Sequence, residues 1–280
     1  MEAGHALVDL GGGARLERFG ARLTDRPHPL ALGSRVDPEA WRGADLRFDR
    51  ERGWTGPADL AVPWPIELDG LTLELRATEA GQVGLFPEHA EVLPWLREQV
   101  AAGIASRGSP PSVLHLFAYT GLATLAMASA GASVVHLDAS RPTVAWARRN
   151  AELSGLQDRP VRWIVDDATA FADREVRRGR RYAGIVLDPP SYGHGPGSGA
   201  WRIDDDLRPL LAVLARLLEP DGFVLLTAHS AGFGADRLAT ELAGALGRPV
   251  ADIDAGPSSL ETADGRRLEL GAFARSSGTA

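Results

Sequence analysis

Two different hydrophobic patterns divide the chain. Up to about Ala77, short apolar runs alternate with glycine, proline and other turn residues, which is typical of brief strands joined by tight turns. From Glu88 onward, apolar residues first recur at helical spacing and then fall into alternating strands and helices. The pattern predicts a small β-rich unit over residues 1–77, a connecting segment over 78–110 and a larger α/β domain over 111–280.

The first segment contains two predicted hairpins. One turns at Gly11-Gly12-Gly13, and the other turns at Asp69-Gly70, a pair that favours two-residue loops. Trp41, Trp54 and Trp64 lie in the same segment, and we expect them to form its core or its contact with the rest of the chain. The predicted strands are Ala6–Leu10, Ala14–Phe19, Ala21–Leu23, Leu60–Trp64 and Ile66–Ala77.

The rest of the chain predicts a doubly wound, mostly parallel sheet with a Rossmann-like arrangement, closed by an antiparallel C-terminal hairpin. A helix from Glu88 to about Arg107 leads into it, and the alternation that follows indicates βαβ units. The expected strands are Val113–Phe117, Ser133–Asp138, Val161–Val165, Tyr182–Asp188 and Phe223–Thr227. The expected helices are Leu122–Ala130, Arg141–Ser154, Ala168–Gly179, Ile203–Leu218 and Ala235–Leu246. The closing hairpin is expected from Pro257–Thr262 and Arg267–Ala274.

Composition removes several kinds of chemistry. The 280 residues include no cysteine, which excludes a thiolate nucleophile, an iron–sulfur cluster and a disulfide. All 30 basic residues are arginine, so a lysine base or Schiff base is excluded too. The seven histidines show no metal-ligand spacing, and we expect no metal site.

Hydrophobic residues make up 44% of the chain and charged residues 24%, which are ordinary values for a globular protein. No apolar run is long enough for a membrane span, and the N-terminus lacks a signal-peptide pattern, so we expect a cytoplasmic protein. We also expect it to be a monomer or a homodimer. The net charge of −7 argues against broad polyphosphate binding, although local arginines can still contact nucleic acid.

Candidate binding residues lie where the predicted parallel strands end, because ligands bind open α/β sheets at the carboxyl ends of the strands. The first strand ends in a tight turn into a helix, whose free amides can receive an anion. This turn consists of Phe117, Ala118, Tyr119, Thr120 and Gly121.

The second and third strands end in carboxylates. Asp138 can accept both hydroxyls of a ribose, and Asp167 can accept a hydrogen bond from an exocyclic amine such as that of adenine. Both residues also stand where aspartate is favourable at the start of a helix, so a capping role is the alternative for each.

The fourth strand delivers Asp188 into Pro189-Pro190-Ser191-Tyr192. The two prolines fix the backbone and remove two amide donors, which leaves carbonyl oxygens beside the carboxylate. We expect this group to accept hydrogen bonds from an amine while Tyr192 stacks on a planar substrate.

The strand ends read LFAYTG, VVHLDAS, IVDDA and IVLDPPSY. This series resembles the class I S-adenosylmethionine-dependent methyltransferases, and in particular the branch that methylates large-subunit ribosomal RNA. The resemblance covers about residues 81–275 and includes GQVGLFPEH before the connecting helix. The chain departs from the family at His115, where asparagine is expected, and an RNA-binding PUA domain is not recognisable.

The resemblance implies S-adenosylmethionine as the cofactor. The turn after the first strand would hold the methionine part, Asp138 the ribose and Asp167 with Ala168 the adenine. Asp188 and Pro189 would face the methionine amine and the substrate. The full set of cofactor-binding candidates is Gln82, Phe86, Phe117, Ala118, Tyr119, Thr120, Gly121, Asp138, Ala139, Asp167 and Ala168, and the catalytic candidates are Asp188, Pro189 and Tyr192.

The missing cysteine also bears on the acceptor atom. Methylation of carbon 5 of a pyrimidine normally needs a thiolate that adds to the ring, so a nitrogen acceptor is predicted, most plausibly in structured, possibly ribosomal, RNA. Arg15, Arg18, Arg22 and Arg26 are the candidates for phosphate contacts. The alternatives are a small-molecule methyltransferase, an idle cofactor-binding or RNA-binding module, and a nicotinamide dehydrogenase, whose G-x-G-x-x-G turn is missing.

Overall fold

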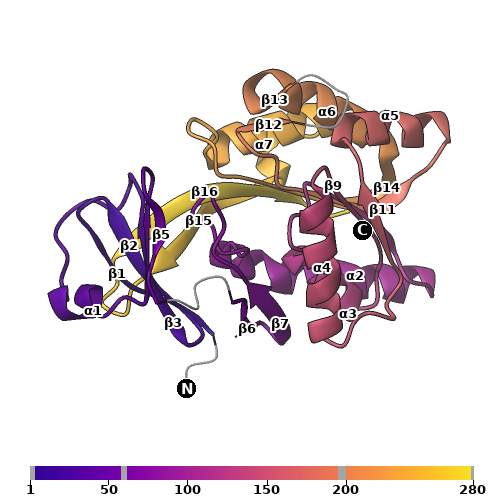
Figure 1. Ribbon diagram of the computed structural model, residues 1–280. Helices are drawn as coiled ribbons and strands as arrows, with labels where there is room; N and C mark the ends of the chain where they lie inside the picture. Colours follow the sequence, from indigo (N-terminus) through magenta and orange to yellow (C-terminus); the bar gives the residue numbers. More distant parts are fainter. Residues whose placement is uncertain (1–3, 58–61, 195–199, 279–280) are drawn as a thin grey trace. The chain divides into compact units, whose positions relative to one another are not determined.

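The computed structural model describes residues 4–57, 62–194 and 200–278. The chain forms two compact units, one of residues 1–90 and 259–270, the other of residues 91–258 and 271–280 (Figure 1). This grouping places residues 78–90 with the β-rich unit and adds part of the C-terminal hairpin to it. The three-part division expected from the sequence stays a prediction.

The first unit is built on a five-stranded sheet in the order β1-β2-β3-β4-β5, in which only the β3–β4 pair is parallel. A separate hairpin turns at Asp69-Gly70, where both residues have positive φ angles of 54° and 75°, as predicted. The strands are β1 (His5–Gly11), β2 (Ala14–Phe19), β3 (Arg22–Pro27), β4 (Leu46–Asp49), β5 (Gly53–Thr55), β6 (Trp64–Leu68) and β7 (Leu71–Leu75).

Three short elements of this unit were not predicted: the helix α1 (Pro38–Arg42), β4 and β5. They span three to five residues each, too few for a periodic pattern. The predicted strand from Leu60 begins outside the described residues, and the observed strand β6 begins at Trp64.

Asp9 on β1 ties several parts of the first unit together. Its side chain is buried, and its Oδ2 accepts hydrogen bonds from the amides of Val36 (2.9 Å) and Asp37 (3.0 Å) and from Trp41 Nε1 (2.6 Å). Its Oδ1 accepts from Arg266 Nη2 at 2.6 Å. Burial alone would raise the pKa of Asp9, but these hydrogen bonds outweigh it and lower the pKa to about 2. One carboxylate therefore joins β1, α1 and the C-terminal hairpin.

Glu17 on β2 is a second buried carboxylate, and it forms ion pairs with two arginines. It pairs with Arg26, with Arg15 Nε at 3.1 Å and with His5 Nε2 at 3.2 Å. Burial would raise the pKa of Glu17, but the adjacent cations hold it well below its usual range. Arg15 and Arg26 are only 7% and 2% exposed, so the prediction that they contact RNA phosphates is wrong. For Arg18 and Arg22 it stays a prediction.

The second unit carries a seven-stranded sheet in the order β10-β9-β8-β11-β14-β16-β15. The first five strands of this order are parallel, and β16 runs antiparallel to β14. The strands are β8 (Ser112–Leu116), β9 (Ser133–Asp138), β10 (Val161–Val165), β11 (Tyr182–Leu187), β14 (Leu218–Ala228), β15 (Asp254–Glu261) and β16 (Arg267–Ser276). The predicted doubly wound sheet with an antiparallel C-terminal hairpin is confirmed.

Helices cover both faces of this sheet. Figure 1 shows α2, α3 and α4 on one face and α5, α6 and α7 on the other. The helices are α2 (Leu93–Arg107), α3 (Leu122–Ser129), α4 (Arg141–Leu153), α5 (Ala168–Arg177), α6 (Ile203–Leu217) and α7 (Ala235–Leu246). The helix expected from Glu88 starts later, because Pro87–Val92 forms a 3₁₀ turn (η1) and α2 begins only at Leu93.

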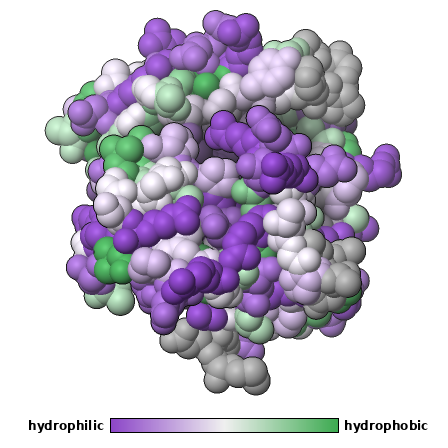
Figure 2. Space-filling view, turned by 60° about the vertical axis from the view of Figure 1, so that its left-hand side comes forward, coloured by the Kyte–Doolittle hydropathy of each residue, from purple (hydrophilic) through white to green (hydrophobic). Residues whose placement is uncertain are grey.

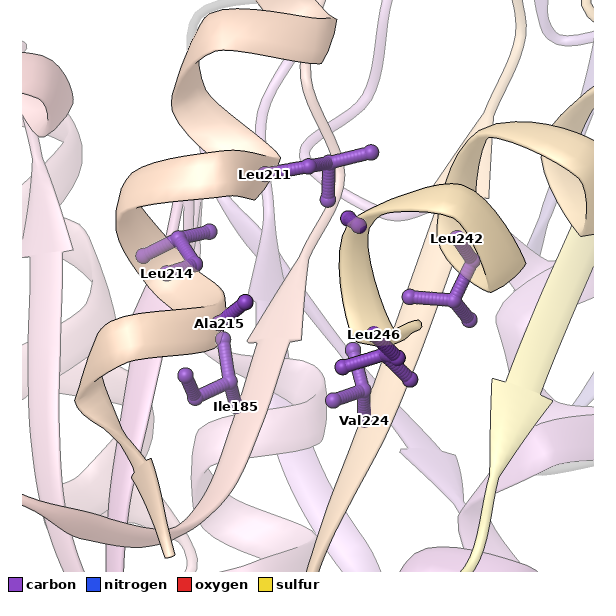
Figure 3. A pocket seen from close by; sticks show the side chains of 8 residues that line it. Ile185, Leu211, Leu214, Ala215, Val224, Leu242 and Leu246 are labelled. Atoms are coloured by element: carbon purple, nitrogen blue, oxygen red, sulfur yellow. The ribbon is translucent and has the colours of Figure 1, made fainter. Parts of the chain in front are cut away.

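The layer between α6, α7 and the sheet is packed with aliphatic side chains. Figure 3 shows them around a cavity of about 10 Å³. Its lining is Ile185, Leu211, Leu214, Ala215, Val224, Leu242, Ala245 and Leu246. A space of this size holds at most about one water and offers it no polar side chain, so it is a packing feature rather than a ligand site.

The surface is predominantly polar on the face that Figure 2 shows, where hydrophobic side chains form small separate patches. Within the ranges that the structure describes, no helix combines the length and the hydrophobicity that crossing a bilayer would require.

We predict that Asp9→Asn lowers the free energy of unfolding by about 3 kcal/mol at neutral pH, because it leaves Arg266 without its buried charged partner. The folded-state pKa of Asp9 is depressed, so its contribution is present above the unfolded value near 4 and is lost as the pH falls toward about 2. The difference in the free energy of unfolding between the wild type and the variant should become smaller as the pH falls over that range. Urea unfolding at several pH values measures it.

Glu67→Gln is the matched control, because Glu67 is an exposed carboxylate of the same unit. It should leave the unfolding curve within about 0.5 kcal/mol of the wild type. If Asp9→Asn lowers the free energy of unfolding by no more than about 0.5 kcal/mol, Asp9 does not hold the unit together.

Candidate active site

The register of three neighbouring strands gathers the predicted strand-end residues of the second unit. Leu116 of β8 pairs with Leu187 of β11 on one side and with Leu137 of β9 on the other. The residues that follow these three leucines therefore emerge together at the carboxyl edge of the sheet. The order of the strands reverses between β8 and β11, and such a switch point is where open α/β sheets bind ligands.

The turn after β8 is held in a strained conformation. Phe117 and Tyr119 have positive φ angles of 52° and 49°, which few residues other than glycine adopt. The amide of Ala118 donates to the Leu137 carbonyl at 3.1 Å, so the turn is fastened to β9. Strain of this kind persists only where surrounding contacts impose it, and it concentrates at functional sites.

Gly121 ends the turn and begins α3 in the left-handed region, with φ +94°. A Cβ at this position would lie 3.2 Å from the Cβ of Ala147, so glycine also serves the close packing of α4. No side chain caps the N-terminus of α3, and its first amides face the edge where an anion can bind.

Asp138 at the end of β9 receives two backbone amides, Ser140 N on Oδ1 (2.9 Å) and Tyr119 N on Oδ2 (3.0 Å). Burial raises the pKa of this carboxyl group, and the two hydrogen bonds oppose the rise. Each oxygen keeps a second lone pair, so the carboxylate can still accept two hydroxyl donors.

Asp167 follows β10 and caps α5, since its Oδ1 accepts from Ala170 N at 2.8 Å. Asp166 beside it accepts from Asp167 N at 2.9 Å and pairs with Arg174. The capping alternative considered for Asp167 is thus realised, while adenine binding by Asp167 and Ala168 stays a prediction.

Asp188 after β11 is fixed by the neighbouring strand. Thr227 Oγ1 on β14 donates to Asp188 Oδ1 at 2.7 Å, and His229 Nε2 lies 3.7 Å from the same oxygen. No described residue donates to the Pro189 carbonyl. The Pro190 carbonyl, however, accepts from Trp201 Nε1 at 2.7 Å, so it is not left free beside the carboxylate. For the Pro189 carbonyl the expectation stays a prediction.

The sequence analysis predicted no strand between Asp188 and Ile203, but this segment contains two short antiparallel strands, β12 (Tyr192–His194) and β13 (Ala200–Arg202). Trp201 on β13 is buried, and its ring centre lies 5.0 Å from that of Phe117. Trp201 thereby links the turn after β8 to the segment after β11. Tyr192 is 55% exposed, as a base-stacking side chain would need to be.

Sequence reasoning missed Trp201 and Thr227. An aromatic residue inside a glycine-rich segment was the one available signal for Trp201. Thr227 and His229 carried a positional signal, because they stand at the end of the strand next to the Asp188 strand.

Gln82 and Phe86, the proposed cofactor-covering residues, belong to the first unit. Gln82 Oε1 accepts from Arg26 Nη1 at 3.1 Å, and the Phe86 ring lies 5.8 Å from the His89 ring. Their covering role stays a prediction.

Comparison with known proteins gives a consistent result. Residues 44–250 match the family of S-adenosylmethionine-dependent methyltransferases. A solved S-adenosylmethionine-dependent methyltransferase from Agrobacterium tumefaciens has a TM-score of 0.90 and 34% identity, over 98% of this chain and 90% of the other.

Two curated relatives carry more specific names. A ribosomal RNA large subunit methyltransferase K/L from Methylococcus capsulatus is 36% identical over 163 residues, which are 58% of this chain and 21% of the relative. A ribosomal RNA large subunit methyltransferase K from Neisseria meningitidis is 31% identical over 240 residues, which are 83% of this chain and 64% of the relative. The chain thus spans about a fifth of the first relative and less than two thirds of the second.

We predict that Trp201→Phe loosens the segment 188–193, because the Pro190 carbonyl loses its donor while a ring remains against Phe117. Opening of these backbone amides should become easier by about 1 kcal/mol. Hydrogen exchange followed by mass spectrometry measures this for each peptide.

Trp54→Phe supplies a matched control. Trp54 Nε1 donates to the Thr78 carbonyl at 2.7 Å, so the same kind of hydrogen bond is lost, but in the first unit. Equal exchange of 188–193 in Trp201→Phe and Trp54→Phe would mean that Trp201 does not order this segment.

Proposed function

The chain belongs to the S-adenosylmethionine-dependent methyltransferase family, and we propose that it methylates a base nitrogen of large-subunit ribosomal RNA. It is an enzyme that uses S-adenosylmethionine as its methyl donor. The observation that carries the proposed acceptor chemistry is the Asp188 carboxylate beside the Pro189 carbonyl at the switch point of the sheet. The names of the curated relatives support the choice of RNA.

The donor set at the edge of the sheet fits the proposed cofactor. Uncapped amides at the start of α3 suit a carboxylate, and the Asp138 oxygens suit a pair of hydroxyls. When bound, the cofactor supplies a methyl group already activated by a sulfonium, so the protein has mainly to align the acceptor and exclude water.

We assign the holding roles accordingly. The turn from Phe117 to Gly121 holds the methionine part through its backbone, Asp138 and Ala139 hold the ribose, and Asp167 with Ala168 holds the adenine. Gln82 and Phe86 cover the cofactor.

The acceptor site consists of three groups from one segment. The Asp188 carboxylate and the Pro189 carbonyl accept hydrogen bonds from the acceptor base, and Tyr192 stacks on it. No cysteine exists to activate carbon 5 of a pyrimidine, which favours nitrogen. A base within a helix must first be unstacked or flipped, at a cost of a few kcal/mol.

We expect Asp138→Ala to weaken the binding of S-adenosylmethionine and of its demethylated product alike. Losing charge-assisted hydrogen bonds to the ribose costs about 1.5 to 3 kcal/mol, which corresponds to a 10- to 150-fold rise in Kd. Isothermal titration calorimetry gives both affinities. Asp173→Ala, at an aspartate within α5 well beyond its capping turn, serves as the control and should bind both ligands normally. Unchanged affinity in Asp138→Ala would remove this residue from the site.

The acceptor itself is tested with unmodified large-subunit ribosomal RNA, transcribed in vitro, and labelled cofactor. The RNA is digested to nucleosides after the reaction, and the methylated species is identified by chromatography and mass. We predict a nitrogen-methylated nucleoside. A carbon-5-methylated pyrimidine would contradict the acceptor chemistry, and label confined to small molecules of a cell extract would favour the small-molecule alternative.

A further inference from the structure

We propose that a cluster of exposed arginines around the end of α5 binds the phosphate backbone of the RNA substrate. This inference rests on the function proposed above and adds the surface on which the RNA lies. The arginine cluster consists of Arg162, Arg177, Arg178, Arg180 and Arg181. Within the part of the chain that the structure describes, most of these side chains have no carboxylate partner.

One buried carboxylate shows that the cluster is gathered in space. Glu175 on α5 accepts hydrogen bonds from Arg178 Nη1 at 2.9 Å and from the Tyr182 hydroxyl at 2.7 Å. Burial would raise the pKa of Glu175, but these hydrogen bonds and the nearby charge of Arg162 lower it. Burial and Glu175 raise the pKa of Tyr182, while the charges of Arg162 and Arg180 act against that rise. Arg162 from β10 and Arg180 from the loop before β11 therefore lie in one region.

The positive charge of this region is not balanced locally. From position 174 to position 181 the chain has five arginines and one acidic residue, Glu175, in a protein whose net charge is −7. Asp158 and Asp173 are exposed and close in the sequence, but neither forms an ion pair with a described residue of the cluster. The surface at this end of α5 therefore keeps an excess of positive charge.

Structural roles account for only part of the cluster. A cation at the C-terminus of a helix is favourable, which explains Arg177 and Arg178 at the end of α5. Arg181 Nη1 donates to a backbone carbonyl of β14 at 3.1 Å. Arg162 and Arg180 have no such role. Together with Arg177, they form neither an ion pair nor a side-chain hydrogen bond with any residue in the described ranges.

Accessible arginines at three other places are paired. Arg208, Arg237 and Arg267 each form an ion pair with a carboxylate, at 2.9, 3.0 and 2.9 Å. An anion that approaches one of these arginines has to compete with the carboxylate. At Arg162, Arg177 and Arg180 it meets no such competitor.

The chemistry of the cluster suits phosphate groups. A guanidinium can donate two parallel hydrogen bonds to a phosphate, which adds geometry to the charge attraction. Phe171 and Tyr182, aromatic residues of this region, are buried and offer no ring on which a base could stack. The cluster can therefore hold an RNA by its backbone without reading its bases.

The arginine cluster and the proposed acceptor site lie at opposite edges of the sheet. Helix α5 begins after the carboxyl end of β10 and ends before the start of β11 (Figure 1). Its 10 residues span about 15 Å. A folded RNA can extend over this distance, whereas a single nucleoside at the acceptor site cannot reach the cluster. The cluster thus favours a polymeric substrate.

The test measures binding of in vitro transcribed large-subunit ribosomal RNA by filter retention at several salt concentrations. The cluster variant carries Arg162→Gln, Arg177→Gln and Arg180→Gln. Each lost phosphate contact lowers the slope of log Kd against log salt concentration by about 0.7 to 0.9. We therefore expect the slope to fall by about 2 and the affinity near 0.1 M salt to fall roughly a hundredfold.

A second triple variant, Arg208→Gln, Arg237→Gln and Arg267→Gln, removes the same charge from arginines that are already paired. It should bind the RNA within about twofold of the wild type and with the same salt dependence. An equal loss of affinity in the two triple variants would mean that only the net charge matters, and it would overturn the proposal.

A docking role also predicts which steps stay unchanged. In the cluster variant, calorimetry should give a normal affinity for S-adenosylhomocysteine, and the rate of methyl transfer should return to the wild-type value at saturating RNA. A rate that stays low at saturating RNA would contradict a role in docking alone.

The outcomes separate this inference from the proposed function. Wild-type protein that neither binds nor methylates the ribosomal RNA contradicts the proposed function itself. Wild-type protein that binds the RNA, together with a cluster variant that keeps the same affinity and salt dependence, contradicts only the role of the arginine cluster.

Discussion

The site depends on the register between β8 and β11. Pairing of Leu116 with Leu187 fixes where both strands end, and therefore sets the strained turn beside Asp188. Every residue of β11 is buried, so a slip by one position would carry a buried side chain to the opposite face and draw Asp188 toward the sheet. The hydrophobic run from Tyr182 to Leu187 thus disfavours any other register and holds the Asp188 carboxylate in place.

Much of this arrangement could be predicted from the sequence because it is encoded locally. The alternation of strands and helices, the Asp-Gly turn at position 69 and the residues that end β8, β9, β10 and β11 all follow from short-range patterns. The hairpin of β12 and β13 could not be predicted, because glycines mask its strand character. Trp201 and Thr227 acquire their roles through contacts with Pro190 and Asp188, 11 and 39 residues away, which no periodicity reveals.

The two buried carboxylates of the first unit show a second limit of sequence reasoning. The arginines near the N-terminus suggested a phosphate-binding surface. In the structure, however, Glu17 forms ion pairs with Arg15 and Arg26, and Asp9 forms one with Arg266. Removing one partner from such a pair costs more than the pair contributes, so these contacts constrain the unit without providing a nucleic-acid surface. The proposed contact with RNA must therefore be sought among arginines that remain accessible.

We infer that the cofactor binds where β8, β9 and β11 end. A crystal structure of the protein with S-adenosylhomocysteine tests this most directly. We expect the ribose hydroxyls to lie within hydrogen-bonding distance of the Asp138 carboxylate and the amino acid part to lie against the turn from Phe117 to Gly121. A ligand bound elsewhere, or a ribose held by a different carboxylate, would contradict it.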